Sequence, residues 1–161
     1  MATYTTTLPA TYISPLNDVE RIAGFNRKFV IPYSYVAQAS ATTATDVVTV
    51  TLGNTPAIWA VSNARAYVST AFSGTTALTI QVGSTSSVGA FITAQSVLTV
   101  ASLNQASTLP VLTNATATAA VSLVATFTNA TGGSPSAVTA GSVTILLNVE
   151  DVGATTTYAA S

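Results

Sequence analysis

Residues 142–151 read SVTILLNVED, and this stretch gives the clearest indication of the fold class. Its apolar side chains recur at every second position, at Val143, Ile145, Leu147 and Val149. Successive side chains of a β-strand point to opposite faces, so a period of two indicates a strand with one buried face. Residues 118–128 repeat the pattern, with apolar side chains at Val121, Leu123, Ala125 and Phe127. These two segments predict a protein built from β-strands.

Outward from these segments, shorter alternating stretches lie between turn-forming residues. We expect further strands at residues 29–36, 46–52, 58–72, 77–82 and 89–101. Pro32 lacks an amide donor and places the first of them at a sheet edge. The turn at residues 73–75 predicts a hairpin into residues 77–82. Residues 89–101 also fit a helical face, although we favour a strand. Residues 129–136 are rich in turn-forming residues and predict a projecting loop.

The number of strands and the lack of a long helical pattern leave a β-sandwich or a barrel. We expect an all-β fold with a single β-sandwich over residues 29–152, wired as a Greek key or jelly roll. Residues 1–28 contain Pro9 and Pro15 and predict an extended N-terminal arm, with one helical turn before Gly24. Residues 153–161 predict a flexible or partner-docked tail.

The composition removes the usual parts of most enzymes. The chain of 161 residues has no cysteine and no histidine, and only 6% of its residues are charged. Thiolate nucleophiles, cysteine metal sites and serine–histidine triads are therefore excluded. Glu150 and Asp151 are adjacent, so in a strand they point to opposite faces and cannot readily act as an acid–base pair. We expect a protein that is not an enzyme and that needs no cofactor.

Charge is unevenly distributed along the chain. Five of the charged residues lie close together, at Asp18, Glu20, Arg21, Arg27 and Lys28. They could form ion pairs with a partner or simply be a solvated face. The stretch from Ala66 to Val149 carries no formal charge, which argues against phosphate contacts and nucleic-acid binding. A near-neutral surface instead favours association with other proteins.

The amino terminus lacks the basic and apolar regions of a secretory signal, and no run of apolar residues approaches the length of a membrane span. We therefore expect a protein made in the cytoplasm and not bound to a membrane.

Three segments carry a resemblance to a known family. They are AYVSTAFSG at residues 66–74, ALTIQVG at residues 77–83 and GSVTILLNVED at residues 141–151. In the style of its sequence over residues 57–151, the chain resembles the capsid cement, or decoration, proteins of tailed bacteriophages. The resemblance implies a jelly-roll-like sandwich on the exterior of the virion capsid. It also implies two partners, the major capsid protein and further copies of the same chain in a homodimer or homotrimer.

With this resemblance, the arm becomes the expected contact with a capsid or a sister subunit. Its apolar residues would bury surface there, and its cations would set the orientation. These expected interface residues are Tyr4, Leu8, Tyr12, Ile13, Arg21, Arg27 and Lys28. Two alternatives stay open. One is a tail, neck or fibre protein of the virion with a projecting loop, and the other is a carbohydrate-binding or surface-layer module that exposes Trp59 and tyrosines.

Overall fold

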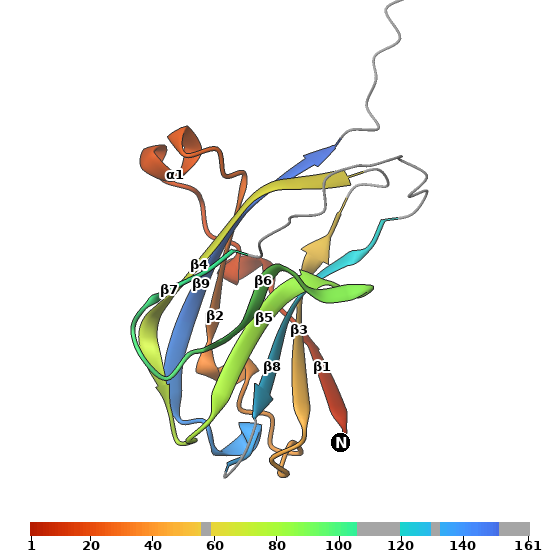
Figure 1. The fold of residues 1–161 in the computed structure, drawn as a ribbon, viewed down its shortest axis with the longest axis vertical. Coiled ribbons are helices and arrows are strands. Elements are labelled where there is room, and N and C mark those ends of the chain that lie inside the picture. Colours follow the sequence, from red (N-terminus) through yellow and green to blue (C-terminus); the bar gives the residue numbers. More distant parts are fainter. Residues whose placement is uncertain (56–58, 106–119, 130–132, 152–161) are drawn as a thin grey trace, which may run out of the picture.

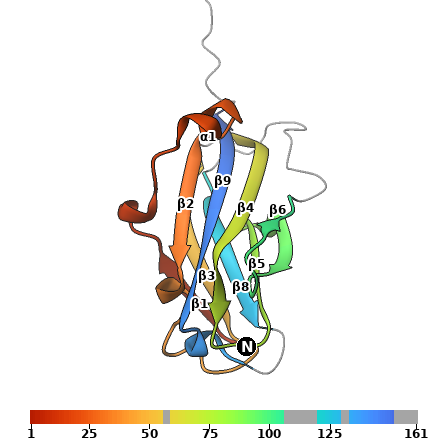
Figure 2. The same cartoon turned by 90° about the vertical axis from the view of Figure 1, so that its left-hand side faces the viewer.

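The computed structural model describes residues 1–55, 59–105, 120–129 and 133–151. Two β-sheets pack face to face, and short helices lie at the ends and along one side (Figures 1 and 2). The expected all-β sandwich is confirmed, and its jelly-roll wiring stays a prediction.

The five-stranded sheet has the order β1-β3-β8-β5-β6. Its strands are β1 (Thr3–Thr7), β3 (Val47–Asn54), β8 (Ser122–Asn129), β5 (Leu78–Ser84) and β6 (Ser87–Ser96). The four-stranded sheet has the order β2-β9-β4-β7. Its strands are β2 (Arg27–Pro32), β9 (Ala140–Asp151), β4 (Trp59–Ser73) and β7 (Ser102–Leu103). Neighbouring strands are antiparallel, except that β1 runs parallel to β3.

The helical elements are short. The α-helix α1 spans Asp18–Ile22, and the 3₁₀ helices are η1 (Ala10–Tyr12), η2 (Tyr33–Tyr35) and η3 (Pro135–Ala137). The turn expected before Gly24 is thus present as α1, and Gly24 follows it with a φ of 85°. A left-handed residue of this kind commonly ends a helix, and glycine adopts it without a Cβ penalty.

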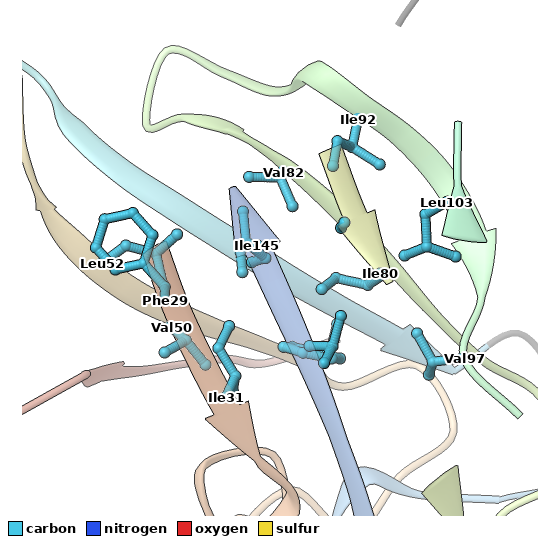
Figure 3. Close-up of a cluster of buried hydrophobic side chains, with 14 of the residues drawn as sticks. Phe29, Ile31, Val50, Leu52, Ile80, Val82, Ile92, Val97, Leu103 and Ile145 are labelled. Carbon is cyan, nitrogen blue, oxygen red and sulfur yellow. The ribbon is translucent and has the colours of Figure 1, made fainter. Parts of the chain in front are cut away.

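The core lies between the sheets and follows the period of two seen in the sequence. Every residue of the alternating set on β3, β8 and β9 is buried, namely Val48, Val50, Leu52, Leu123, Ala125, Phe127, Val143, Ile145, Leu147 and Val149. Phe29 and Ile31 of β2 join this cluster from the edge of the four-stranded sheet (Figure 3). Each large apolar side chain buried in this way stabilises the fold by about 1.5–3 kcal/mol.

Three expectations about the strands are wrong. The strand expected at residues 29–36 ends at Pro32, because Val36 instead donates its amide to the carbonyl of Tyr33 and closes the turn of η2. Residues 97–101 are not a strand, although the Val97 side chain enters the core (Figure 3). The turn at Gly74 does not close a hairpin, because β4 and β5 belong to different sheets and the chain crosses between them there.

The N-terminal segment also differs from the expected extended arm. Its strand β1 pairs with β3, from Thr3 opposite Val47 to Thr7 opposite Thr51. Further along, Ile13 bridges to β2, and Ser14 donates its amide to the Lys28 carbonyl at 3.1 Å. We call residues 1–14 the N-terminal strap, because they run from the edge of one sheet to the edge of the other (Figure 1). Open edges present unpaired backbone groups, and the strap pairs with those of β3 and meets the edge of β2 at Ile13.

Candidate functional site

The charged residues gather on one side and one end of the sandwich. The strands of the five-stranded sheet contain no charged residue. All charged residues except Asp46 lie on or beside the four-stranded sheet, in α1 (Asp18, Glu20, Arg21), β2 (Arg27, Lys28), β4 (Arg65) and β9 (Glu150, Asp151). The strand pairing places Arg65 opposite Leu146 and Leu146 opposite Lys28, so these cations share one row across the sheet. The candidate site is the end of the molecule that carries α1.

A capping box holds the short helix α1. The Glu20 amide donates to Oδ1 of Asn17 at 2.8 Å, and the Asn17 amide donates to Oε2 of Glu20 at 2.8 Å. This reciprocal pair satisfies amides that a helix N-terminus leaves without partners. A five-residue helix has too few internal hydrogen bonds to persist alone, so these contacts define its position.

An ion pair fixes α1 to the four-stranded sheet. Nζ of Lys28 lies 2.8 Å from Oε1 of Glu20, and the two side chains are only 17% and 12% exposed. The hydrogen bond from Lys28 lowers the pKa of Glu20, and the bond from the Asn17 amide adds to this effect. Glu20 therefore serves both the helix cap and the ion pair.

The helix presents two apolar side chains to solvent. Val19 is 75% exposed and Ile22 is 87% exposed. Residues three apart lie on neighbouring positions of a helix surface, so the two form one patch, which we call the α1 apolar pair. Helix α1 stands out from the end of the sandwich in both views (Figures 1 and 2). A scattered exposed apolar residue is ordinary, but a rigidly held pair on a projecting element indicates a contact surface.

Two grooves flank α1. The first, the β4 groove, has a volume of about 580 Å³ and lies between α1 and the strands β4 and β7. Its wall includes Val19, Arg65 and Tyr67, and its floor includes Leu146, which faces outward from β9 yet is 7% exposed. The guanidinium of Arg65 has no ionic or hydrogen-bond partner among the described residues, so it is available to a ligand or a partner.

The second groove, the strap groove, has a volume of about 430 Å³ and lies between the strap and the start of β2. It is lined by apolar residues and by three cations, Arg21, Arg27 and Lys28, with no carboxylate among its described lining residues. The guanidinium of Arg27 donates to the Asn54 carbonyl at 2.9 Å, and partial burial lowers its pKa. Arg21 is exposed, and its guanidinium has no hydrogen-bond or ionic partner within the described ranges.

The structure divides the predicted interface residues into two groups. It brings Ile13, Arg21, Arg27 and Lys28 together around the strap groove, where Ile13 is 46% exposed. It places the other three, Tyr4, Leu8 and Tyr12, on this chain's own core. Leu8 is 4% exposed, so it is not available to a capsid as the sequence suggested. The reason is that the inner face of the strap covers the open side of the sandwich.

The ring of Tyr12 packs on the ring of Tyr35 with centroids 5.2 Å apart and planes at 75°. Edge-to-face contacts of this kind stabilise a fold by about 0.5–1.5 kcal/mol beyond the buried area. Tyr12 is therefore a contact between the strap and the sandwich.

Sequence reasoning missed four residues of the candidate site, Val19, Ile22, Arg65 and Tyr67. The sequence did contain a signal for Val19 and Ile22. They are spaced three apart in a capped helix, and no other apolar residue lies within α1 to give that helix a buried face. Arg65 and Tyr67 alternate with buried alanines on β4, and no local pattern links them to α1. They line the same groove as α1 only because the tertiary fold brings β4 beside it.

Comparisons of the chain with protein-family models, curated proteins and solved structures give no match. Among the described residues, no helix is both long and apolar enough to cross a bilayer, and no group of three or more potential metal-binding side chains is present. The side chain of Trp59 and residues 130–132 of the expected projecting loop lie outside the described part of the chain, as does the tail at residues 153–161.

Proposed function

We propose that the protein is a capsid cement, or decoration, protein that binds the outside of a phage head through its α1 end. The observation that carries this proposal is the α1 apolar pair, two largely exposed side chains on a helix fixed by a capping box and an ion pair. A rigid apolar element loses little conformational freedom when it enters a pocket on a partner. The major capsid protein would supply that pocket.

The surroundings of the pair suit such a contact. Interface energy usually concentrates in a few central apolar or arginine side chains, with a polar rim around them. Val19 and Ile22 would form the centre, while the guanidinium groups of Arg21 and Arg65 have no partners among the described residues. Guanidinium groups form bidentate hydrogen bonds with carboxylates, so acidic side chains on the shell would fix the orientation.

The strand order supports the same proposal. Apart from β1, the two sheets pair as β2-β9-β4-β7 and β3-β8-β5-β6, and we propose that these eight strands are wired as a jelly roll. A jelly roll is the fold that the resemblance to cement proteins implies. A fold alone does not determine function, so the assignment depends on the α1 end.

The test uses shells or virions from the encoding phage that lack this protein. Ile22→Ser removes one member of the apolar pair, and Val100→Ser is the matched control, because Val100 is 69% exposed and lies outside both grooves. In co-sedimentation we expect Ile22→Ser to weaken binding about tenfold or more, and the control to bind like the wild type. Equal binding by both variants would remove α1 from the interface.

Copy number separates the cement role from the alternatives within the virion. Quantitative mass spectrometry of purified particles should give copies comparable to the major shell protein. A handful of copies per particle would instead indicate a tail, neck or fibre protein, and absence from particles would discard the viral proposal.

One observation favours a second candidate function. Tyr67 is 38% exposed beside Arg65 in the β4 groove, and an aromatic ring next to hydrogen-bonding side chains can hold the face of a sugar. A carbohydrate-binding module would bind soluble glycans, and Tyr67→Ala would abolish that binding. A glycan array without any hit would remove this alternative.

A further inference from the structure

The strand β1 is an uncovered sheet edge. It is the outermost strand of the five-stranded sheet and, within the described part of the chain, pairs only with β3. The other edges are covered or short: the strap meets β2 at Ile13, Gln105 bridges to Ile92 of β6, and β7 has two residues. Among the described residues, nothing pairs with the outer side of β1.

The direction of the backbone groups of β1 follows from two hydrogen bonds. Ala2 accepts from the Val47 amide at 2.9 Å, and Leu8 donates to the Thr51 carbonyl at 2.8 Å. Backbone groups of successive strand residues point to alternate sides, so the even-numbered residues face β3. The amides and carbonyls of Thr3, Thr5 and Thr7 therefore point away from the sheet, and no described residue bonds them.

This edge lacks the devices that usually block pairing with another chain. Natural edge strands carry charged side chains, proline or a bulge. In Thr3–Thr7 there is no charge and no proline, and the pairing with β3 runs without a register shift. The side chains alternate between exposed and partly buried, so the strand is regular and has one outer and one inner face.

We infer that β1 pairs with β1 of a second copy, antiparallel about a two-fold axis at Thr5. In this register Thr5 meets Thr5 of the second copy, and Thr3 meets Thr7 of the second copy. Because the backbone amides and carbonyls of these three residues all point away from β3, the two residues of each such pair exchange both N–H···O bonds. The pairing joins two five-stranded sheets into one continuous sheet, in the mode of β-strand addition.

The sequence of the strand explains why the occupant is a second copy. The register matches exposed threonines with exposed threonines and the partly buried Tyr4 with the partly buried Thr6, so both faces of the joined sheet continue. A two-fold contact must be self-complementary, and an uncharged strand brings no like charges together at the axis. The dimer does not depend on the cement proposal, because α1 lies at the other side of the molecule (Figure 1).

Sedimentation equilibrium over a wide concentration range tests the inference. So small a contact gives a weak dimer in solution, with a dissociation constant on the order of 0.1 mM. Thr5→Lys and Thr5→Glu each place like charges opposite one another at the axis, and each should weaken the dimer about fivefold. An equimolar mixture of the two variants should restore association, because opposite charges then meet.

Two further variants make the result specific. Thr5→Pro removes an outward amide and leaves the bonds to β3, so it should abolish the dimer while far-ultraviolet circular dichroism stays unchanged. Thr70→Lys is the control, because it adds the same charge at an exposed position of β4, and it should dimerise like the wild type. A wild type that stays monomeric throughout, a Thr5→Lys dimer as strong as the Thr70→Lys dimer, or a mixture without restored association would each overturn the inference.

Discussion

Gly141 in β9 shows how one residue limits the packing of the sandwich. Its φ is 130°, a region that residues with a Cβ rarely adopt, and a Cβ there would lie 2.4 Å from the ring atom Cγ of Phe72. Phe72 is buried in the core and cannot move away without displacing its neighbours. The close approach of β9 to this ring thus requires glycine.

Gly141→Ala should destabilise the protein by about 3 kcal/mol or more, from backbone strain and from the clash with Phe72. Gly53→Ala is the matched control, because Gly53 has a φ of 141° and open space around its Cβ position. The control should lose about 1–2 kcal/mol from strain alone. Urea unfolding measures both values, and equal losses would show that contact with Phe72 carries no cost.

Asp46 is a buried carboxylate at the end of the molecule opposite α1. It is 3% exposed and accepts hydrogen bonds from the amides of Thr43 and Ala2, both at 3.0 Å. The bonds from Thr43 and then from Ala2 favour the ionised form and lower its pKa. The ionised carboxylate therefore links the strap, through the Ala2 amide, to the loop before β3, through the Thr43 amide.

A carboxyl group with a lowered native pKa stabilises the fold above its unfolded pKa, and this contribution is lost as the pH falls through the native value. Wild-type stability should therefore fall as the pH drops below about 4. In Asp46→Asn, which does not titrate there, that fall should be smaller, so the stability difference between the two proteins narrows at pH 3. Urea midpoints at pH 6 and pH 3 check this, and a constant difference would contradict it.

At the scale of elements, the N-terminal strap is part of the sandwich and not an appendage. If residues 1–28 were an extended arm outside the sandwich, as the sequence predicted, deleting residues 1–16 would leave a folded domain. In the structure this deletion exposes the edge of β3, removes the buried Leu8 and takes away the bonds to β2. Unprotected edges also promote pairing between chains.

We therefore expect the protein without residues 1–16 to unfold at a lower urea concentration and to aggregate at concentrations where the wild type stays dispersed. Leu8→Ala separates the core contribution from that of the edge, and should cost about 2–4 kcal/mol without causing aggregation. Light scattering and urea titration measure the two effects. A truncated protein as stable as the wild type would show that the strap does not support the sandwich.

At the scale of the whole molecule, the two sheets have different outer surfaces. The strands of the five-stranded sheet are uncharged and place hydroxyl side chains on their outer face, such as Thr5 and Thr49 in one register. The four-stranded sheet and α1 carry the cations, the grooves and the α1 apolar pair. Under the two proposals above, one molecule would bind a shell through its charged end and a sister copy through the edge of its neutral sheet.

The fold class and most of the core could be predicted without the structure. Alternation with a period of two is a local property, because each strand residue points to the face opposite its neighbour. Val48, Phe127 and Ile145 could therefore be assigned to the interior from the sequence pattern alone. The cap at Asn17 and the end of α1 at Gly24 are likewise local, since they depend on side chains within one helical turn.

The tertiary packing, and no local pattern, sets which open surfaces the strap covers and which residues form the site. Tyr4 and Leu8 look the same in sequence whether they pack on their own sandwich or on a partner, because burial depends on distant strands. Arg65 lines the same groove as α1 only because β4 and β2 both pair with β9, across more than a hundred residues of chain between Lys28 and Leu146. Contacts between segments so far apart are set by sheet order, which no local pattern encodes.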